Sequence, residues 1–291
     1  MPELPELAVY RERLEEALRG RTVTRVTVHD PFVLRTVEPP VDAAVGRAVT
    51  GVARRSKLLL VELEGPLLFA FHMMLGGRLH LKRAEKFKAH RRRTLFSAEL
   101  DDGTVLEMTE AGTKRRASLH VLGRRSDLAR IDRGVEPLEA DFTIERLAEL
   151  LRARNRQLKK ALRDPSLLSG IGNAYSDEIL FAARLSPMRL THRLEDEEIV
   201  RLHESIVGTL SDWIARIREA CPSGLPVKQN DWRKAMAVHG RAGEPCPRCG
   251  TEVCRVSFKD SETCYCPDCQ NEGRLLADRR LSRLGIRRRG G

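Results

Sequence analysis

The sequence predicts an α+β protein: an N-terminal helix and a β-sandwich, then a helical region, and last a hairpin rich in cysteine. Three observations predict this order. Short segments of β-branched and aliphatic residues, separated by turn signals, fill most of residues 22–122. From residue 141 the apolar residues recur at helical spacing. Six of the seven cysteines fall in the last 46 residues. A chain of 291 residues is long enough for two domains.

The first element is an amphipathic helix over residues 7–18. Its apolar residues at positions 7, 10, 14, 17 and 18 recur at helical spacing. Pro5 stands where the first turn of a helix tolerates proline.

The residues before this helix could carry chemistry. Pro2 is small enough for removal of Met1 to be expected, which would expose a secondary amine. Such an amine attacks aldehyde or sugar carbons to form an iminium, as a catalytic lysine does. Glu3 and Glu6 stand beside it as candidate proton carriers. The alternative is that the prolines only begin the helix and the glutamates favour its dipole.

The β-rich region divides into short predicted strands. Asp101-Asp102-Gly103 is a hairpin turn between two of them, and a linker follows at residues 133–140. The predicted strands cover residues 22–28, 48–53, 58–63, 67–72, 93–100, 104–108 and 117–122.

The helical region predicts helices at residues 143–151, 158–162, 174–181 and 196–220, with a loop at 222–233. Thr143 is a capping residue without the full capping box. Gly170-Ile171-Gly172-Asn173 joins two helices, and such a turn can aim backbone N–H groups and Asn173 at a phosphate. The alternative is an ordinary helix pair with a glycine C-cap.

The cysteines have the spacing of a zinc site. Cys246 and Cys249 form one C-x2-C pair, and Cys266 and Cys269 form a second, sixteen residues further on. Four thiolates complete the tetrahedral shell of one Zn2+ ion, so the site is structural rather than catalytic. The other two cysteines of the hairpin, Cys254 and Cys264, are interpreted as packing residues or, alternatively, as a replacement ligand.

The composition favours a polyanionic partner. Lys and Arg number 52 against 41 Asp and Glu, which gives a net charge of +11 and a pI near 9.7. Phosphate contacts supply most non-specific nucleic-acid affinity, although charge alone also fits a basic protein without such a partner. Aromatic residues make up 4%, which disfavours stacking on single strands. No signal peptide or membrane-spanning run is visible, so we expect a cytoplasmic monomer with reduced thiols.

Together these motifs resemble the formamidopyrimidine-DNA glycosylase and endonuclease VIII family of bifunctional repair enzymes. The resemblance rests on Pro-Glu-Leu-Pro-Glu at residues 2–6, Arg-Arg-Ser-Lys at 54–57, Gly-Ile-Gly-Asn-Ala-Tyr-Ser-Asp-Glu at 170–178, and residues 238–246 before the cysteine hairpin. It implies a catalytic β-sandwich domain at 1–132, a helix–two-turn–helix domain at 141–237, a zinc hairpin at 238–278 and a basic tail at 279–291. The implied partner is double-stranded DNA with a damaged base or an abasic site, bound between the domains.

The resemblance also implies roles for individual residues. The damaged base is flipped out, and the Pro2 amine attacks the sugar carbon and expels the base. Glu3 manages protons at the sugar, and Glu6 orients the substrate. Lys57 and Asn173 match positions that hold the phosphates around the flipped nucleotide. The alternative for Lys57 is a solvated lysine at the start of a strand.

Three departures from the family pattern concern how DNA is read. Leu75 stands where the purine-specific branch carries an intercalating methionine; leucine can still wedge into a duplex, or it packs in the core. Residues 110–117 lack that branch's Arg-Phe-Gly, so Lys114 and Arg115 are the candidate DNA contacts there. Ser261 stands where the hairpin's phosphate-binding arginine is expected, and Lys259 would replace it only in part.

The sequence therefore predicts a DNA glycosylase of base excision repair with abasic-site lyase activity and altered lesion choice. The alternative is a non-catalytic protein that binds damaged DNA on the same fold. A third hypothesis, an RNA- or ribosome-associated zinc-ribbon protein, leaves the Pro2-Glu3 start unexplained.

Overall fold

The computed structural model describes residues 1–112, 114–131, 134–258 and 261–277. The chain divides into two compact units. The first comprises Met1–Arg133 and Ile214–Gln229, and the second comprises Gly134–Trp213 and Asn230–Gly291. Residues 214–229, which the sequence places with the helical region, thus group with the N-terminal unit.

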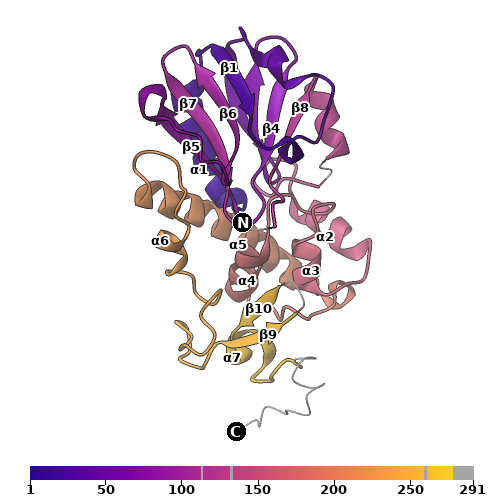
Figure 1. Cartoon of the computed structure of the whole chain (residues 1–291). Coiled ribbons are helices and arrows are strands. Elements are labelled where there is room, and N and C mark those ends of the chain that lie inside the picture. Colours follow the sequence, from indigo (N-terminus) through magenta and orange to yellow (C-terminus); the bar gives the residue numbers. More distant parts are fainter. Residues whose placement is uncertain (113, 132–133, 259–260, 278–291) are drawn as a thin grey trace. The chain divides into compact units, whose positions relative to one another are not determined.

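The first unit contains helix α1 and two four-stranded antiparallel sheets that form a β-sandwich (Figure 1). The strand orders are β1-β6-β7-β5 and β2-β3-β4-β8. The bounds are α1 Leu4–Leu18, β1 Val23–Val28, β2 Val49–Arg55, β3 Leu58–Leu63, β4 Leu68–His72, β5 Gly77–Arg83, β6 Thr94–Leu100, β7 Thr104–Glu110 and β8 Ser118–Leu122. Short 3-10 helices lie at Pro31–Val33, Val41–Ala44, Ala84–Lys86 and Arg125–Arg130.

The main core of this unit lies between α1 and the two sheets. Phe69, Phe71 and Phe96 meet there with ring centroids 5.5–6.1 Å apart, which are favourable edge-on and tilted contacts. Most of the predicted strands are present within one or two residues, and Asp101-Asp102-Gly103 is the turn between β6 and β7. Strand β5 was not predicted, because only Leu79 and Leu81 mark it among three basic residues and a histidine, and the Gly76-Gly77 pair at its start is typical of a turn.

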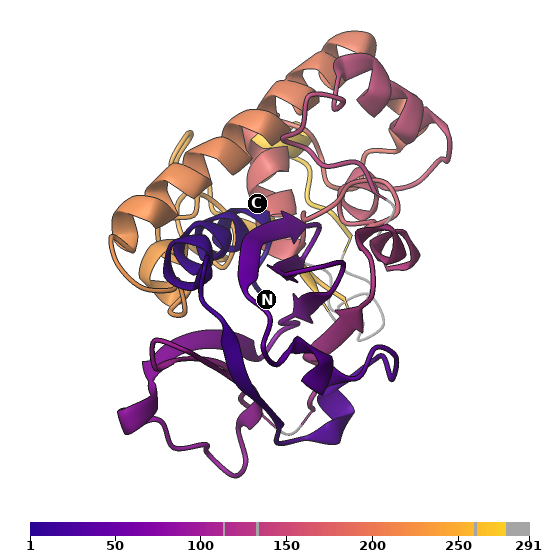
Figure 2. The ribbon, with the colours of Figure 1, turned by 90° about the horizontal axis from the view of Figure 1, so that it is seen from above.

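Helix α1 packs against β2 and β3, as the view in Figure 2 also shows. Its polar face holds the returning segment 214–229. Arg218 forms an ion pair with Glu12 at 2.8 Å, and Arg13 donates to the carbonyls of Cys221 and Pro222. These contacts explain why this segment belongs to the first unit.

The second unit is mainly helical and ends in the cysteine hairpin. Thr143 caps α2, because its hydroxyl accepts from the Arg146 N–H, as predicted. Helix α6 differs from the sequence expectation of a loop over residues 222–233. The bounds are α2 Ile144–Arg152, α3 Leu158–Leu162, α4 Asn173–Ala182, a 3-10 turn at Thr191–Arg193, α5 Asp196–Ala220, α6 Asn230–Arg233, β9 Cys254–Ser257, β10 Glu262–Tyr265 and α7 Pro267–Asn271. The residues of α5 from Ile214 onward group with the first unit.

Candidate active site and zinc hairpin

The N-terminus is fixed by a reciprocal capping box at the start of α1. The Glu6 carboxylate accepts from the Glu3 N–H at 2.9 Å, and the Glu3 carboxylate accepts from the Glu6 N–H. Pro2, Glu3 and Glu6 are all buried, and the Glu6 side chain is fully so. The helix begins at Leu4, three residues before the predicted start, with Pro5 in its first turn. The capping box therefore fixes the position of Glu3, the residue directly after Pro2.

Tyr10 of α1 is buried in the same core as Leu79 of β5. Burial raises the pKa of Tyr10 well above its usual value, while Arg78 lowers it and Glu6 raises it further. Arg78 also donates to the carbonyl of Leu75 at 3.2 Å. Tyr10 of α1, Met73 of the β4–β5 turn and Leu79 of β5 thus belong to one hydrophobic core.

Lys57 lies in the turn between β2 and β3, directly before Leu58 at the start of β3. Ser56 precedes it with a φ of 53°, a left-handed conformation that is uncommon for serine. The turn is closed by a bond from the Arg54 guanidinium to the Ser56 carbonyl at 3.0 Å. Lys57 is half-buried.

His72, at the end of β4, is close enough to respond to Lys57. Burial lowers the pKa of His72 to about 4, and the charges of Lys57 and His120 lower it further. Its Nδ1 accepts from the Met74 N–H at 3.2 Å, as a neutral imidazole can. Because Leu58 pairs with His72, the Lys57 turn and the β4–β5 turn share one end of the sheet.

Leu75 sits at the tip of the β4–β5 turn and is 68% exposed, so the core-packing alternative is wrong. The two glycines after it allow close backbone approach. A Cβ at Gly76 would lie 2.7 Å from the Ala111 carbonyl oxygen, and one at Gly77 would collide with the carbonyl of Met73. The turn therefore presents an apolar side chain on a tightly packed backbone.

The β7–β8 loop is held by Glu110. This buried carboxylate accepts from the N–H groups of Arg116 and Ala117 at 2.9 and 3.0 Å. Lys114 is exposed on the loop. Arg115 is instead engaged within the protein: it forms an ion pair with Asp30 and donates to the carbonyl of Arg92.

In the second unit, Asn173 begins α4. Its Oδ1 atom is buried and has no hydrogen-bond partner among the described residues. A buried amide atom without a partner costs free energy. The Oδ1 atom therefore lacks a donor, whereas an anion at the N-terminus of α4 would be bound by the backbone N–H groups and the Nδ2 amide of Asn173.

One carboxylate fastens the hairpin to α4. Glu178 is buried and accepts three backbone N–H groups, from Ala237 at 2.7 Å and from Val238 and His239 at 2.9 Å. Burial raises the pKa of Glu178, and the three donors oppose that rise. Glu178 belongs to the motif at residues 170–178, but its partners lie 59 to 61 residues further along the chain, so the motif alone does not reveal its role.

The four predicted zinc ligands come together. The Sγ atoms of Cys246, Cys249, Cys266 and Cys269 all lie within 4.8 Å of one another, with pairs at 3.4 and 4.0 Å. A tetrahedron of Zn–S bonds near 2.3 Å needs sulfur atoms about 3.8 Å apart. The donor set therefore fits one structural zinc ion.

The remaining hairpin cysteines are buried in two different clusters. Cys264 packs with Val238 and Val253, and Cys254 packs with Val256 and Tyr265. The sulfur of Cys264 also lies near Asp177 and His239.

Each carboxylate oxygen of Asp177 has a partner. Asp177 pairs with Lys159 at 2.6 Å and with the Nδ1 atom of His239 at 2.9 Å.

Of the predicted contacts on the hairpin, Lys259 falls outside the described residues.

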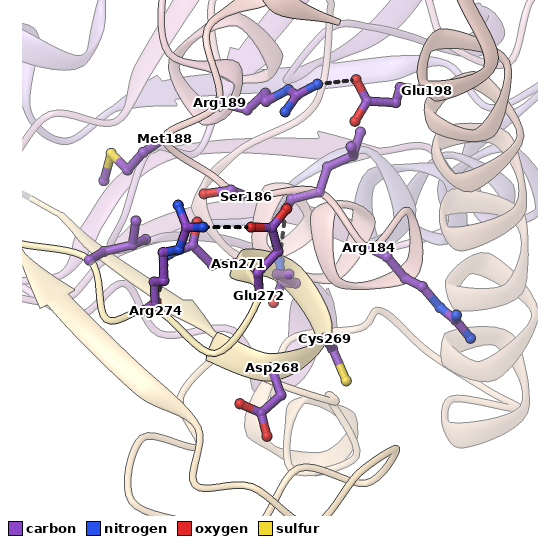
Figure 3. A pocket seen from close by; sticks show the side chains of 13 residues that line it. Arg184, Ser186, Met188, Arg189, Glu198, Asp268, Cys269, Asn271, Glu272 and Arg274 are labelled. Atoms are coloured by element: carbon purple, nitrogen blue, oxygen red, sulfur yellow. Dashed lines mark hydrogen bonds and ion pairs between the residues drawn. The ribbon is translucent and has the colours of Figure 1, made fainter. Parts of the chain in front are cut away.

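A cavity of about 400 Å³ lies beside α7 (Figure 3). Its charges are largely paired, with Arg189 on Glu198 at 2.7 Å and Arg274 on Glu272 at 3.2 Å. The cavity contains none of the predicted catalytic residues, and we assign it no ligand.

Comparison with known proteins decides the family. The chain matches the formamidopyrimidine-DNA glycosylase N-terminal domain over residues 1–116, the H2TH domain over 133–220, and the zinc finger found in FPG and IleRS over 243–271. A formamidopyrimidine-DNA glycosylase from Chloroflexus aurantiacus is 35% identical over 276 residues, covering 93% of this chain and 98% of the relative.

The chain belongs to the formamidopyrimidine-DNA glycosylase family. The family comprises bifunctional DNA glycosylases and abasic-site lyases of base excision repair. The predicted family, fold, enzyme class and structural zinc are thereby confirmed.

Solved structures agree with this assignment. MutM (Fpg) from Thermus thermophilus is 33% identical, with a TM-score of 0.79 over 94% of this chain and 100% of that one. Lactococcus lactis Fpg, solved with DNA containing N7-benzyl-Fapy-dG, is 25% identical, with a TM-score of 0.83 over 93% and 100%. Within the described part of this glycosylase, no helix has the length and apolarity needed to cross a membrane.

Proposed function

We propose that this glycosylase binds double-stranded DNA at a damaged base or an abasic site and forms an iminium through the Pro2 amine. The capping box carries the proposal, because it holds Pro2 and Glu3 in one buried arrangement at the start of α1. The nucleophile requires removal of Met1, since an acylated proline nitrogen has no lone pair for attack.

The proposed chemistry balances as follows. The Pro2 nitrogen bonds to the sugar C1′, the bond from C1′ to the base breaks, and the base leaves with the bonding electrons and takes a proton. The nitrogen then loses its proton, the sugar ring opens with protonation of its oxygen, and the iminium forms. Loss of a proton from C2′ expels the 3′ phosphate, and a second elimination expels the 5′ phosphate. Water finally releases the amine.

The proposed roles follow from position and charge. Glu3 adjoins the nucleophile and moves protons at the sugar, whereas Glu6 acts as a positioning residue through the Glu3 N–H. Lys57 supplies a cation at the end of the sandwich where Leu75 projects. Leu75 would fill the gap in the base stack as an apolar wedge.

The other proposed DNA contacts carry unequal support. Asn173 begins α4, where its Nδ2 amide and the backbone N–H groups of the helix start can donate to a phosphate, and Lys114 is exposed, so both are suited to contact the backbone. Arg115 must first leave Asp30, so we propose only a secondary role for it. A cytoplasmic location near the nucleoid is part of the same proposal, because the substrate is found there.

Borohydride trapping with a duplex carrying one abasic site tests the proposal. The protein is first shown by mass spectrometry to begin at Pro2, and we expect a covalent protein–DNA adduct. The matched control is the same chain with one extra residue before Pro2, which keeps the fold but acylates the nitrogen. That control should bind the duplex and give no adduct. Binding without an adduct by the Pro2-initiated protein would overturn the iminium mechanism.

A further inference from the structure

A second cavity, of about 370 Å³, lies in the helical unit between α3 and the cysteine hairpin. Three cationic residues of α3 and its C-cap line it: Lys159, Lys160 and Arg163. Ser261 and Thr263 line it from the hairpin. None of the described residues that line this cavity is acidic. Its chemistry therefore suits an anion.

The cations of this cavity differ in whether their charge is already used. Lys159 is buried against Asp177 at 2.6 Å and also donates to the Glu262 carbonyl at 2.8 Å. Lys160 is exposed at the rim. Arg163 is half-buried, and no carboxylate among the described residues pairs with it. Its guanidinium is held in place, and within residues 1–112, 114–131, 134–258 and 261–277 no carboxylate neutralises its charge.

The guanidinium of Arg163 is held at Ser261. Its Nη1 atom donates to the Ser261 Oγ atom at 3.2 Å, across 98 residues of sequence. This bond uses one of the five N–H donors of the guanidinium, and the hydroxyl carries no charge. The remaining donors stay available for a second, anionic acceptor in the cavity.

We infer that Arg163 and Ser261 form a phosphate-binding site for the DNA backbone, in which the helix supplies the charge and the hairpin positions it. The inference rests on the proposed DNA-binding function. A guanidinium in this place compensates for the serine, since it presents a forked, permanently charged donor at the position of the hydroxyl.

A purely structural role for Arg163 makes a different prediction. An arginine at a helix C-terminus can simply stabilise the carbonyl end of the helix. In that case its removal lowers the unfolding temperature and leaves the salt dependence of DNA binding unchanged. The salt slope therefore separates the two roles.

The test compares duplex binding by the wild-type enzyme and Arg163→Gln across 50–200 mM salt, using a duplex with an uncleavable abasic-site analogue. Each phosphate contact contributes about 0.9 to the slope of log K against log salt. We expect Arg163→Gln to lower the slope by about that amount and to weaken binding at 50 mM salt about tenfold. Glutamine can still bond Ser261, so the fold should be retained, and zinc content and the unfolding temperature check this.

Arg193→Gln is the matched control, because Arg193 is exposed in the same unit and does not line the cavity. It removes one charge without removing the proposed contact and sets the baseline change in slope. An equal change in both variants would overturn the inference.

A double variant tests whether the charge must lie at this particular site. Ser261→Arg in the Arg163→Gln background should restore the lost slope, because it returns a guanidinium to the same site from the hairpin side. No recovery, in a protein with full zinc content, would also overturn the inference. If the wild-type enzyme itself did not prefer the abasic-site duplex over a matched one, the proposed function would fail instead.

Discussion

The pKa of His72 depends on its burial and on the charges around it. His72 lies at the end of β4, next to the lysine proposed to bind phosphate, and its pKa is lowered to about 4, chiefly by burial. A neutral imidazole there accepts the Met74 N–H and adds no charge beside Lys57. The residue therefore supports the Leu75 turn only while it is unprotonated.

This has a consequence for stability against pH. The folded pKa near 4 lies below the ordinary value of 6.5, so the unfolded chain binds the proton more readily between these values. The contribution of His72 is complete above pH 6.5 and is lost as the pH falls towards 4, by up to about 3 kcal/mol. Urea unfolding at pH 7, 5.5 and 4.5 should show this loss, and His72→Gln should reduce it. An identical pH profile for the variant would contradict the assignment.

The chemistry of Pro2 can also be tested at the scale of one residue. Pro2→Gly leaves a primary amine at the same place, so we expect base release and strand cleavage to change in rate relative to one another. Single-turnover kinetics on one damaged duplex measure both steps. Glu6→Gln is a useful companion, because its amide oxygen can still accept the Glu3 N–H. Unchanged kinetics in Pro2→Gly would remove Pro2 from the mechanism.

At the scale of elements, loops are held by buried carboxylates. Glu110 fixes the β7–β8 loop, and Glu178 fixes the segment that leads into the cysteine hairpin. Each accepts backbone N–H groups that no regular element satisfies. The loop that carries Lys114 and the segment that leads into the hairpin are thus each anchored by a buried carboxylate.

The zinc hairpin should depend on its metal as a unit. Cys249→Ser removes one thiolate, so we expect loss of zinc and weaker duplex binding, with the α1 capping box untouched. Elemental analysis and a binding titration measure the two effects. Cys254→Ser is the control, since Cys254 packs with Val256 and Tyr265 and lies outside the four-sulfur cluster. Full metal retention by Cys249→Ser would refute the four-ligand site.

At the scale of the whole molecule, the net charge of +11 should make DNA binding depend on salt. The cations at Lys57 and Arg163 alone, each neutralising one phosphate, give a slope near −1.8. Affinity for an abasic-site duplex should then fall at least about tenfold between 50 and 200 mM salt. Fluorescence anisotropy at three salt concentrations measures it, and a flat response would argue against backbone binding.

The sequence predicted the features that are local in the chain. The Pro2 to Glu6 start, the two cysteine pairs and the Thr143 cap each lie within a few residues, so spacing alone reveals them. Contacts across the chain were not predictable in this way. The Arg115–Asp30 pair spans 85 residues and engages within the protein an arginine that the sequence predicted as a DNA contact.

The Arg163–Ser261 bond spans 98 residues and joins a helix to a hairpin, so no motif contains both of its members. Strand β5 was missed for a different reason. Its outward residues are basic or histidine, and Gly76 and Gly77 before it are typical of a turn.

The three amides that Glu178 accepts can also serve as a built-in reporter. Ala237, Val238 and His239 belong to no helix or strand, yet their N–H groups point at a buried carboxylate. Their protons should exchange with deuterated water as slowly as those of a regular helix while the hairpin is docked, and quickly once it detaches. Peptide-level exchange across this segment would therefore report the state of the hairpin in a sample that contains no DNA.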